Sequence, residues 1–179
     1  MNIFVTGRPS VGKTTVIQRT IEELQNLGYK HGGISTPEIR VEGIRVGFEI
    51  VNLATSSRGI LAHIESPAGP RIGRYKVNLN DLRTVGVTAI EEAIKNADYI
   101  VIDEVGPMEL LSKDFRGAIL SAIKSQKPVL GVIHWRMQVP LVKEIKSRSD
   151  VRIYEVTPKN RESLHRTLVE KIVESIKRA

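Results

Sequence analysis

The chain has 179 residues, of which 41% are hydrophobic, a size and composition typical of one globular domain with a buried core. It contains no cysteine, which excludes disulfides and thiolate metal sites, and its four histidines lie too far apart in sequence for metal-ligand spacing. The net charge of +7 leaves anionic partners open, whereas the aromatic content of 4% is low for a protein that stacks on nucleic-acid bases.

The first predicted element is a short buried strand, Ile3–Val5, which runs directly into a glycine-containing loop, Gly7–Thr14. The loop reads GRPSVGKT and fits G-x-x-x-x-G-K-[ST], the P-loop or Walker A pattern. In such a loop, successive backbone N–H groups bind phosphate together with the N-terminus of the helix that follows. Because a strand precedes the motif and a helix follows it, a chance match in a glycine-containing turn is disfavoured.

The parts of this loop have different expected roles in binding a triphosphate. Gly7 and Gly12 provide backbone angles and close approaches that a Cβ atom would block. Lys13 is expected to reach the β- and γ-phosphates, and the Thr14 hydroxyl to bind Mg²⁺. The nucleotide-binding residues predicted here are Gly7, Arg8, Pro9, Ser10, Val11, Gly12, Lys13, Thr14 and Thr15.

An amphipathic helix is predicted from Thr14 to Leu27, with Gly28 as its stop. Residues 31–78 differ, because they contain short β-rich segments separated by Gly, Pro and Ser and no helical pattern. The predicted strands are Ile44–Leu53, Gly59–Glu65 and Ile72–Val77, with breaks at Pro37–Gly43, Ala54–Arg58 and Ser66–Pro70. We interpret residues 31–78 as a β-meander inserted into a single domain formed by residues 1–179.

Helices and strands then alternate to the end of the chain. The predicted helices are Asn80–Ala97, Met108–Gln126 and Val139–Ser147, the predicted strands are Tyr99–Val105, Pro128–Ile133 and Val151–Val156, and a last helix starts with Thr157 as N-cap and Pro158 in its first turn. This alternation predicts an α/β fold with a parallel sheet, helices on both faces, and a ligand site at the carboxyl ends of the strands.

The predicted strand Tyr99–Val105 carries two acids near its end, as a Walker B strand does. A carboxylate from Asp103 at the phosphate edge would hold Mg²⁺ through a water, and Glu104 would orient and deprotonate the attacking water. The nucleotide-binding segment predicted here is Ile100, Val101, Ile102, Asp103 and Glu104. Because any strand can end in acids, the interpretation as a Walker B strand depends on the P-loop upstream.

Several further residues are candidates for the same site. His134 follows the next strand, where related ATPases place a polar sensor of the γ-phosphate, and a purely structural histidine is the alternative. Trp135 would stack on a base or be a half-buried aromatic residue. Arg71, Arg74 and Arg116 are candidates for stabilising charge on the γ-phosphoryl oxygens, the alternative being ordinary surface cations.

The signatures of other P-loop classes are absent from the sequence. It contains no Asn-Lys-x-Asp, which disfavours a guanine-specific GTPase, and no Leu-Ser-Gly-Gly, which disfavours an ABC-type ATPase. No arginine-rich helical lid is evident, which weakens the interpretation as a nucleotide kinase.

Five stretches, Val5–Thr15, Gly33–Arg40, Gly69–Tyr75, Ile102–Leu110 and Glu155–Arg161, carry a resemblance that extends over nearly the whole chain. They resemble the THEP1-type nucleoside-triphosphatases of thermophilic bacteria and archaea, which are related to a human cancer-related nucleoside triphosphatase. The resemblance implies a RecA-like parallel sheet flanked by helices, with a β-rich insertion. It also implies Mg²⁺-dependent hydrolysis of ATP, GTP and other nucleoside triphosphates to the diphosphate and phosphate.

An NTP phosphohydrolase is therefore the leading hypothesis, in which Lys13 clamps the phosphates, Thr14 and Asp103 hold Mg²⁺, and Glu104 activates water. The alternatives are a kinase for a small molecule or nucleotide, with the meander as acceptor site, and a nucleic-acid-dependent ATPase. Nucleic acid is not favoured, because residues 140–179 contribute +4 of the charge along helical patterns without a basic stripe. With no apolar run of membrane-spanning length and no signal-peptide pattern, a cytoplasmic monomer is expected.

Overall fold

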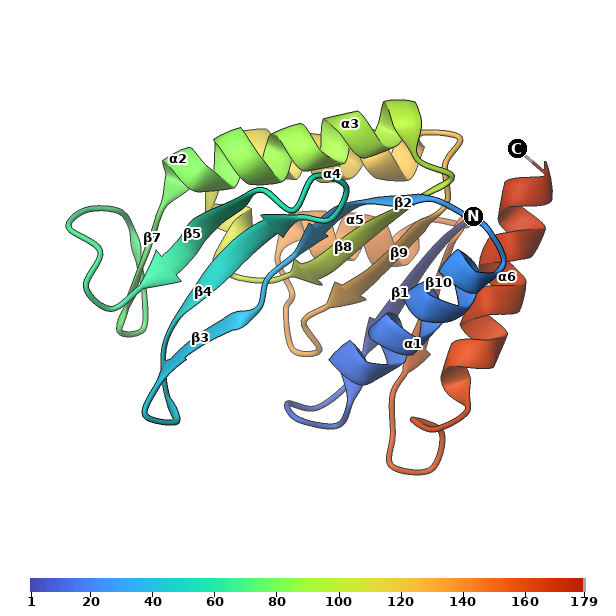
Figure 1. Cartoon of the computed structure of the whole chain (residues 1–179), viewed down its shortest axis with the longest axis horizontal. Helices are drawn as coiled ribbons and strands as arrows, with labels where there is room; N and C mark the ends of the chain where they lie inside the picture. Colours follow the sequence, from blue (N-terminus) through green and yellow to red (C-terminus); the bar gives the residue numbers. More distant parts are fainter. Residues whose placement is uncertain (179) are drawn as a thin grey trace.

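The computed structural model describes residues 1–178 and contains one ten-stranded mixed sheet with helices on both faces (Figure 1). The strands are β1 (Asn2–Thr6), β2 (His31–Ser35), β3 (Glu38–Val41), β4 (Ile44–Asn52), β5 (Arg58–His63), β6 (Arg71–Ile72), β7 (Tyr75–Val77), β8 (Tyr99–Val105), β9 (Val129–Ile133) and β10 (Val151–Glu155). The α-helices are α1 (Lys13–Asn26), α2 (Leu79–Asp81), α3 (Thr88–Asn96), α4 (Lys113–Lys124), α5 (Pro140–Ser147) and α6 (Leu164–Arg178), and a π-helical segment, Leu82–Val87, joins α2 to α3.

The strand order is β10-β1-β9-β8-β2-β4-β5-β7-β6, with β3 paired to β4. The first five strands in this order are parallel, and β4 joins β2 in the antiparallel sense. This arrangement confirms the predicted fold class, a parallel sheet flanked by helices with a β-rich extension. The meander is therefore not a separate layer, because it continues the sheet beyond β2.

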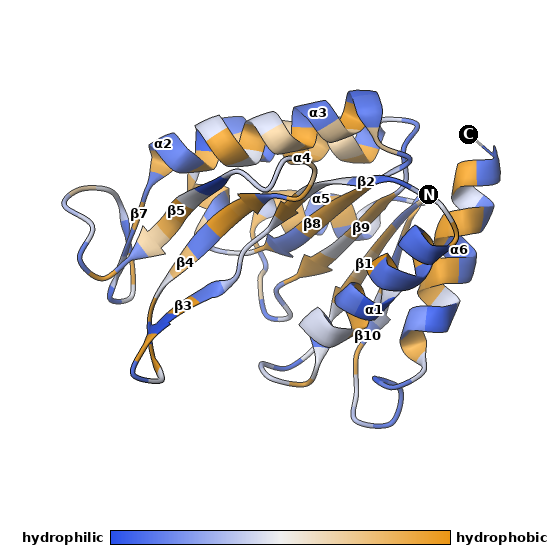
Figure 2. Ribbon diagram, in the orientation of Figure 1, coloured by the Kyte–Doolittle hydropathy of each residue, from blue (hydrophilic) through white to orange (hydrophobic). Residues whose placement is uncertain are grey.

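Alternate side chains of the parallel strands supply two hydrophobic cores. Ile3 and Val5 of β1 pack with α1 and α6, whereas Phe4 between them packs into the core under α3, α4 and α5. In β8, Val101 faces the first core, and Ile102 faces the second. Figure 2 shows the apolar residues concentrated on the central strands and on the helix sides that face them. Such runs, apolar on both faces, are typical of buried parallel strands.

Most predicted boundaries agree with the structure to within one or two residues, and the predicted stop of α1 is confirmed. Gly28 has a left-handed φ of 88°, its N–H donates to the Gln25 carbonyl oxygen, and the Tyr29 N–H donates to the Leu24 carbonyl oxygen. These bonds satisfy carbonyl groups at the helix end, as in a Schellman motif.

Residues 31–78 differ from the prediction at three places. The break expected at Pro37–Gly43 contains strand β3, which pairs with β4 across a turn where Gly43 has φ 79°. The single strand expected at Ile72–Val77 is a hairpin of β6 and β7, because Gly73, with φ 58°, turns the chain between them. No strand was predicted at β2, which lies in the range predicted as the meander but pairs in parallel with β8, so the parallel core extends into residues 31–35.

Two predicted helix starts were wrong. The helix expected at Met108–Gln126 is interrupted after a 3₁₀ turn at Glu109–Leu111, because the Ser112 hydroxyl accepts a hydrogen bond from the Phe115 N–H and caps α4.

Thr157 is not the N-cap of α6, which begins at Leu164. The Asn160 side chain accepts from the Thr157 N–H at 2.8 Å and donates to the Glu155 carbonyl at 2.9 Å, so it stabilises a turn where a helix was expected. Among residues 1–178, no helix is long and apolar enough to cross a membrane.

The contact between β2 and β8 generates a prediction at Gly33. Its φ is 109°, and a Cβ atom there would overlap the backbone carbonyl oxygen of Val101. Gly33→Ala combines left-handed strain with this backbone clash, so we expect a loss of about 3 kcal/mol or more in the free energy of unfolding, measured by urea denaturation.

Gly28→Ala is the matched control, because Gly28 also has a left-handed φ, of 88°, but a Cβ there would meet no atom within 4 Å. Its loss should be about 1 kcal/mol. Equal losses for the two variants would contradict the packing argument.

Candidate active site

The P-loop joins β1 to α1 at the carboxyl edge of the sheet. Gly7 packs so closely that a Cβ would lie 2.8 Å from the carbonyl oxygen of Val156, and Gly12 has a left-handed φ of 109°. The Lys13 ammonium donates to the carbonyl oxygens of Gly7 and Arg8, both at 3.1 Å. The loop is thus folded around its own lysine, whose charge lies at the mouth of the loop.

The two acids of β8 end at the same edge. Strand β9 lies between β1 and β8 and is parallel to both, so one strand separates the P-loop strand from Asp103 and Glu104. The Thr36 hydroxyl, just after β2, donates to the Asp103 backbone carbonyl at 2.6 Å and ties the next strand end to this edge.

A cavity of about 750 Å³ opens between these elements. It is lined by P-loop residues Pro9, Ser10, Lys13 and Thr14, the acids Asp103, Glu104 and Glu109, His134 and Trp135, and meander residues including Thr36, Glu38, Arg45, Phe48 and Leu61. Segments that are remote in sequence therefore meet around one volume that can hold a phosphorylated ligand.

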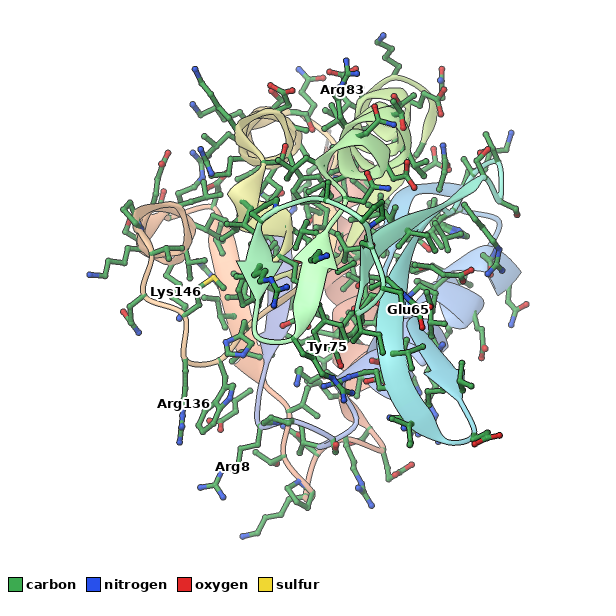
Figure 3. The ribbon with its side chains drawn as sticks, turned by 90° about the vertical axis from the view of Figure 1, so that its left-hand side faces the viewer. Arg8, Glu65, Tyr75, Arg83, Arg136 and Lys146 are labelled. Atoms are coloured by element: carbon green, nitrogen blue, oxygen red, sulfur yellow. The ribbon has the colours of Figure 1, made fainter. Side chains whose placement is uncertain are left out.

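Not every residue of the predicted binding segments faces this cavity. Ile100, Val101 and Ile102 are buried in the sheet and position the two acids. Gly7, Arg8, Val11, Gly12 and Thr15 form the loop and the start of α1, outside the cavity wall. Figure 3 shows Arg8 and Arg136 projecting from the lower side of the molecule.

The acids of the cavity have a raised affinity for protons. Burial raises the pKa of Asp103 to about 6, and the neighbouring charge of Glu104 adds to this, whereas a Thr36 hydrogen bond and the charge of Lys13 oppose it. Burial likewise raises the pKa of Glu104, against the charge of Lys13. Lys13 and the Thr36 hydrogen bond only partly offset the burial of these two adjacent carboxylates, so a cation is favoured beside them.

The oxygen donors at this edge fit Mg²⁺ better than a softer metal. Thr14 offers a hydroxyl and Asp103 a carboxylate, and Mg²⁺ typically takes one or two protein oxygens while water and phosphate oxygens complete its shell. Residues 1–178 contain no cluster of three or more His, Asp or Glu side chains able to hold a metal alone.

No sequence pattern predicted a role for Glu109. It is 5% exposed, lines the cavity, and burial raises its pKa to about 8, with the charges of Glu104 and Asp103 adding to the shift. It is therefore mainly neutral at pH 7. Its only sequence signal is an acid between the apolar residues Met108 and Leu110, a pattern that many exposed turns share.

His134 and Trp135 both line the cavity. The pKa of His134 is lowered by burial first and then by the charges of Lys13 and Arg136, so its imidazole is neutral at pH 7. The Arg136 guanidinium lies over the Trp135 ring, 4.2 Å from its centroid. Both side chains are only partly buried, so a ligand in the cavity can reach them.

The three arginines predicted as candidates do not line the cavity. Arg71 is exposed on β6, Arg74 donates to the Arg45 carbonyl and the Tyr75 hydroxyl, and Arg116 donates to the Leu110 carbonyl. Within the described residues 1–178, the arginine that lines the cavity is Arg45, at the start of β4.

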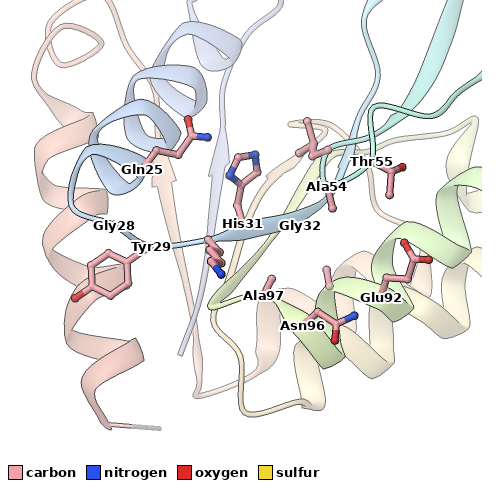
Figure 4. A pocket seen from close by; sticks show the side chains of 13 residues that line it. Gln25, Gly28, Tyr29, His31, Gly32, Ala54, Thr55, Glu92, Asn96 and Ala97 are labelled. Atoms are coloured by element: carbon pink, nitrogen blue, oxygen red, sulfur yellow. The ribbon is translucent and has the colours of Figure 1, made fainter.

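A second pocket, of about 720 Å³, lies at the opposite edge of the sheet, where α1 and α3 end and β2 begins (Figure 4). Its polar lining includes Gln25, His31, Glu92 and Asn96, and it contains no residue of the two motifs. The motif-bearing cavity is therefore the candidate active site.

This chain is similar to known proteins along nearly its whole length. A family model described as NTPase matches residues 2–177. The chain is 44% identical over 178 residues to the nucleoside-triphosphatase THEP1 of Thermofilum pendens, covering 99% of this chain and 98% of that protein. It is 46% identical over 165 residues to the protein of the same name from Methanosarcina acetivorans, covering 92% of each.

Two solved structures are similar along almost their whole length. The crystal structure of THEP1 from the hyperthermophile Aquifex aeolicus has a TM-score of 0.84 at 30% identity and covers 96% of this chain and 99% of its own. The solution structure of a human cancer-related nucleoside triphosphatase has a TM-score of 0.81 at 34% identity and covers 97% and 98%.

The protonated state of Glu109 generates a prediction for stability. Its folded pKa of about 8 lies above the ordinary glutamate pKa of 4.5, so the folded state retains a proton that the unfolded state loses between these pH values. This group should therefore lower the free energy of unfolding as pH rises from about 4.5 to 8, by at most about 1.4 kcal/mol per pH unit.

In Glu109→Gln this contribution should vanish, so the variant gains stability relative to the parent as pH rises from 5 to 8 in urea titrations. Glu65→Gln, at an exposed position of the meander, is the control and should keep the parental slope. A constant difference between Glu109→Gln and the parent would contradict the burial argument.

Proposed function

This chain belongs to the NTPase family and is a nucleoside-triphosphatase, and we propose that the cavity between the P-loop and β8 is its active site. In it, nucleoside 5′-triphosphates are hydrolysed to the diphosphate and phosphate. The observation that carries the proposal is that Lys13, Thr14, Asp103 and Glu104, from two separate motifs, line the same cavity.

Lys13 binds the phosphates in this proposal. Its ammonium lies among the loop carbonyls of Gly7 and Arg8, and NTP binding would exchange these neutral acceptors for charged phosphate oxygens. The exchange is favourable because hydrogen bonds between ionised partners are stronger than bonds to a neutral carbonyl.

Thr14 and Asp103 would hold Mg²⁺, which neutralises charge on the β- and γ-phosphate oxygens when bound. Asp103 suits this task because its carboxylate is buried beside Glu104 and has few compensating partners. Binding of the cation would keep Asp103 ionised throughout the neutral pH range.

Glu104 is the proposed general base. The oxygen of a water attacks the γ-phosphorus, the bond from that phosphorus to the β–γ bridging oxygen breaks, and its electron pair leaves with the diphosphate. The proton of the water passes to the Glu104 carboxylate, whose raised pKa makes it a better acceptor than an exposed glutamate. His134, neutral and in the same cavity, would donate a hydrogen bond to the γ-phosphate.

We propose loose selectivity for the base, so ATP, GTP and other triphosphates are substrates. The motif side chains in the cavity are proposed to act on the phosphates and not on the base, and the sequence lacks the guanine-specific motif. The second candidate is a phosphotransferase, supported by the meander residues Glu38, Phe48 and Leu61 in the cavity wall, where an acceptor would lie. Phosphate that appears on an acceptor, with acceptor-dependent diphosphate formation, would favour this candidate.

Glu104→Gln is the sharpest test of the hydrolysis mechanism. The substitution preserves side-chain size and removes the proton acceptor, so kcat for phosphate release should fall by about a hundredfold or more while NTP binding is retained. Phosphate release is measured with saturating NTP and Mg²⁺, with Glu65→Gln as the control. Hydrolysis at the parental rate by Glu104→Gln would remove the general-base assignment.

Lys13→Ala tests the phosphate clamp. Because the lysine is proposed to contact the phosphates in both the ground and transition states, the variant should lose turnover and bind NTP more weakly. Binding is measured by calorimetry, and turnover by phosphate release with and without Mg²⁺. Lys124→Ala, at the exposed end of α4, should behave as the parent, and equal NTP affinity in Lys13→Ala and the parent would exclude the clamp role.

A further inference from the structure

Arg45 is the arginine that the fold brings into the cavity. It lies at the start of β4, in the meander, and lines the same volume as Lys13, Asp103 and Glu104. Its side chain is 42% exposed, so the guanidinium is accessible to a ligand in the cavity. The P-loop supplies positive charge from one side of this volume, and Arg45 supplies it from the meander side.

Three groups hold the Arg45 guanidinium in place. One terminal nitrogen, Nη1, donates to Glu38 at 2.8 Å, and Nε donates to the Tyr75 hydroxyl at 3.0 Å. The guanidinium carbon also lies 5.1 Å from the ring centroid of Phe48. A side chain fixed in this way has already lost much of its rotamer freedom, so little entropy remains to be lost when it binds an anion.

The fork retains donors for a ligand. A guanidinium has five N–H groups, and within residues 1–178 the side chain of Arg45 makes the two hydrogen bonds just described. The remaining N–H groups suit phosphate oxygens, which guanidinium groups bind in a bidentate manner.

Two further arginines of the meander, Arg40 and Arg74, lie close to the groups that hold Arg45. The Glu38 carboxylate bridges Arg40, at 2.6 Å, and Arg45, at 2.8 Å. Arg74 lies behind Tyr75, with its guanidinium carbon 5.2 Å from that ring centroid and a hydrogen bond of 3.2 Å to its hydroxyl. Arg40 and Arg45 thus share the Glu38 carboxylate, whereas Arg74 contacts Tyr75, which Figure 3 shows among the meander strands.

We propose that Arg45 is a catalytic residue, supplied by the meander, that binds the γ-phosphoryl oxygens of the substrate and stabilises the negative charge they carry in the transition state. This inference rests on the function proposed above. As the bond from the γ-phosphorus to the bridging oxygen breaks and the water oxygen bonds to phosphorus, the Arg45 guanidinium donates hydrogen bonds to the γ-phosphoryl oxygens. Such an arginine raises kcat by a factor of about 10³–10⁵ in P-loop enzymes.

Arg45 also connects β3 to β7 through Glu38 and Tyr75, so a purely structural role is the competing explanation. The two roles differ in what a substitution changes. Loss of a structural contact lowers stability and affects ground-state and transition-state ligands alike. Loss of a catalytic arginine weakens binding of the transition state selectively.

The test compares Arg45→Ala and Arg45→Lys with the parent in two binding measurements, ADP with Mg²⁺ and ADP with Mg²⁺ and fluoroaluminate, a mimic of the phosphoryl transition state. We expect both variants to bind ADP within about twofold of the parent. Arg45→Ala should lose about a hundredfold or more in kcat and in affinity for the fluoroaluminate complex, and Arg45→Lys should recover only part of either, because lysine lacks the planar fork.

Arg58→Ala is the matched control, because Arg58 pairs with Glu49 at 2.6 Å on the same meander, lies outside the cavity wall, and should leave both affinities and kcat unchanged. Millimolar guanidinium should restore part of the turnover of Arg45→Ala and none of that of Glu104→Gln. If Arg45→Ala does not fold, the test uses Arg45→Lys alone. A catalytic role then predicts that Arg45→Lys loses affinity for the fluoroaluminate complex and keeps its affinity for ADP.

The role of Arg45 would be overturned if Arg45→Ala and Arg45→Lys both kept the parental kcat and the parental affinity for the fluoroaluminate complex. It would also be overturned if a folded variant lost affinity for ADP and for the fluoroaluminate complex by the same factor. Such a failure of the Arg45 role leaves the proposed function intact if the parent hydrolyses NTP and Glu104→Gln does not. If the parent itself releases no phosphate from any NTP, the proposed function fails, and the role of Arg45 fails with it.

Discussion

The parallel register of β1, β9 and β8 is the constraint on which the candidate site depends. Leu130 of β9 pairs with Ile3 of β1 on one side and with Val101 of β8 on the other. Because the three strands run in the same direction from this common level, the loop after Thr6 and the acid at 103 emerge at one edge. Backbone hydrogen bonds in the sheet therefore determine the distance between a phosphate-binding loop and a carboxylate that are remote in sequence.

The same sheet accounts for the electrostatics of the site. Strand β8 is buried on both faces, so the acids at its end lie where water cannot fully solvate them, and the pKa of Asp103 rises to about 6. A buried carboxylate pair is unfavourable in the protein alone, and Glu109, with a pKa raised to about 8, avoids part of that repulsion by remaining protonated. A cation and a polyphosphate would supply opposite and balancing charges, which is why such an arrangement suits a site for both.

Sequence patterns predicted the parts of the molecule that local chemistry determines. The P-loop and the Walker B strand were visible because each is a contiguous pattern with a defined neighbouring element, and the stop at Gly28 because left-handed backbone favours glycine. The capping by Ser112 and the turn at Asn160 were missed, since many serines and asparagines neither cap a helix nor stabilise a turn. The positions of Glu109 and Arg45 depend on which segments the sheet brings together, and no local pattern contains that information.

The meander places Arg45 in the cavity, which no local sequence pattern indicates. Its attachment to the sheet also explains how an insertion can position side chains at a phosphate-binding site. Strand β4 pairs with β2, and Thr36, beside β2, donates to the backbone carbonyl of Asp103, so the insertion is hydrogen-bonded to the same edge that carries the acids. A cavity wall built as a continuation of the sheet positions its side chains without a hinge, and Glu38 and Tyr75 limit the motion of Arg45 further. Charge that is fixed before substrate arrives stabilises a transition state more effectively than charge that must reorganise during the reaction. The continuity between meander and sheet is thus the structural basis for expecting a preorganised site in this chain.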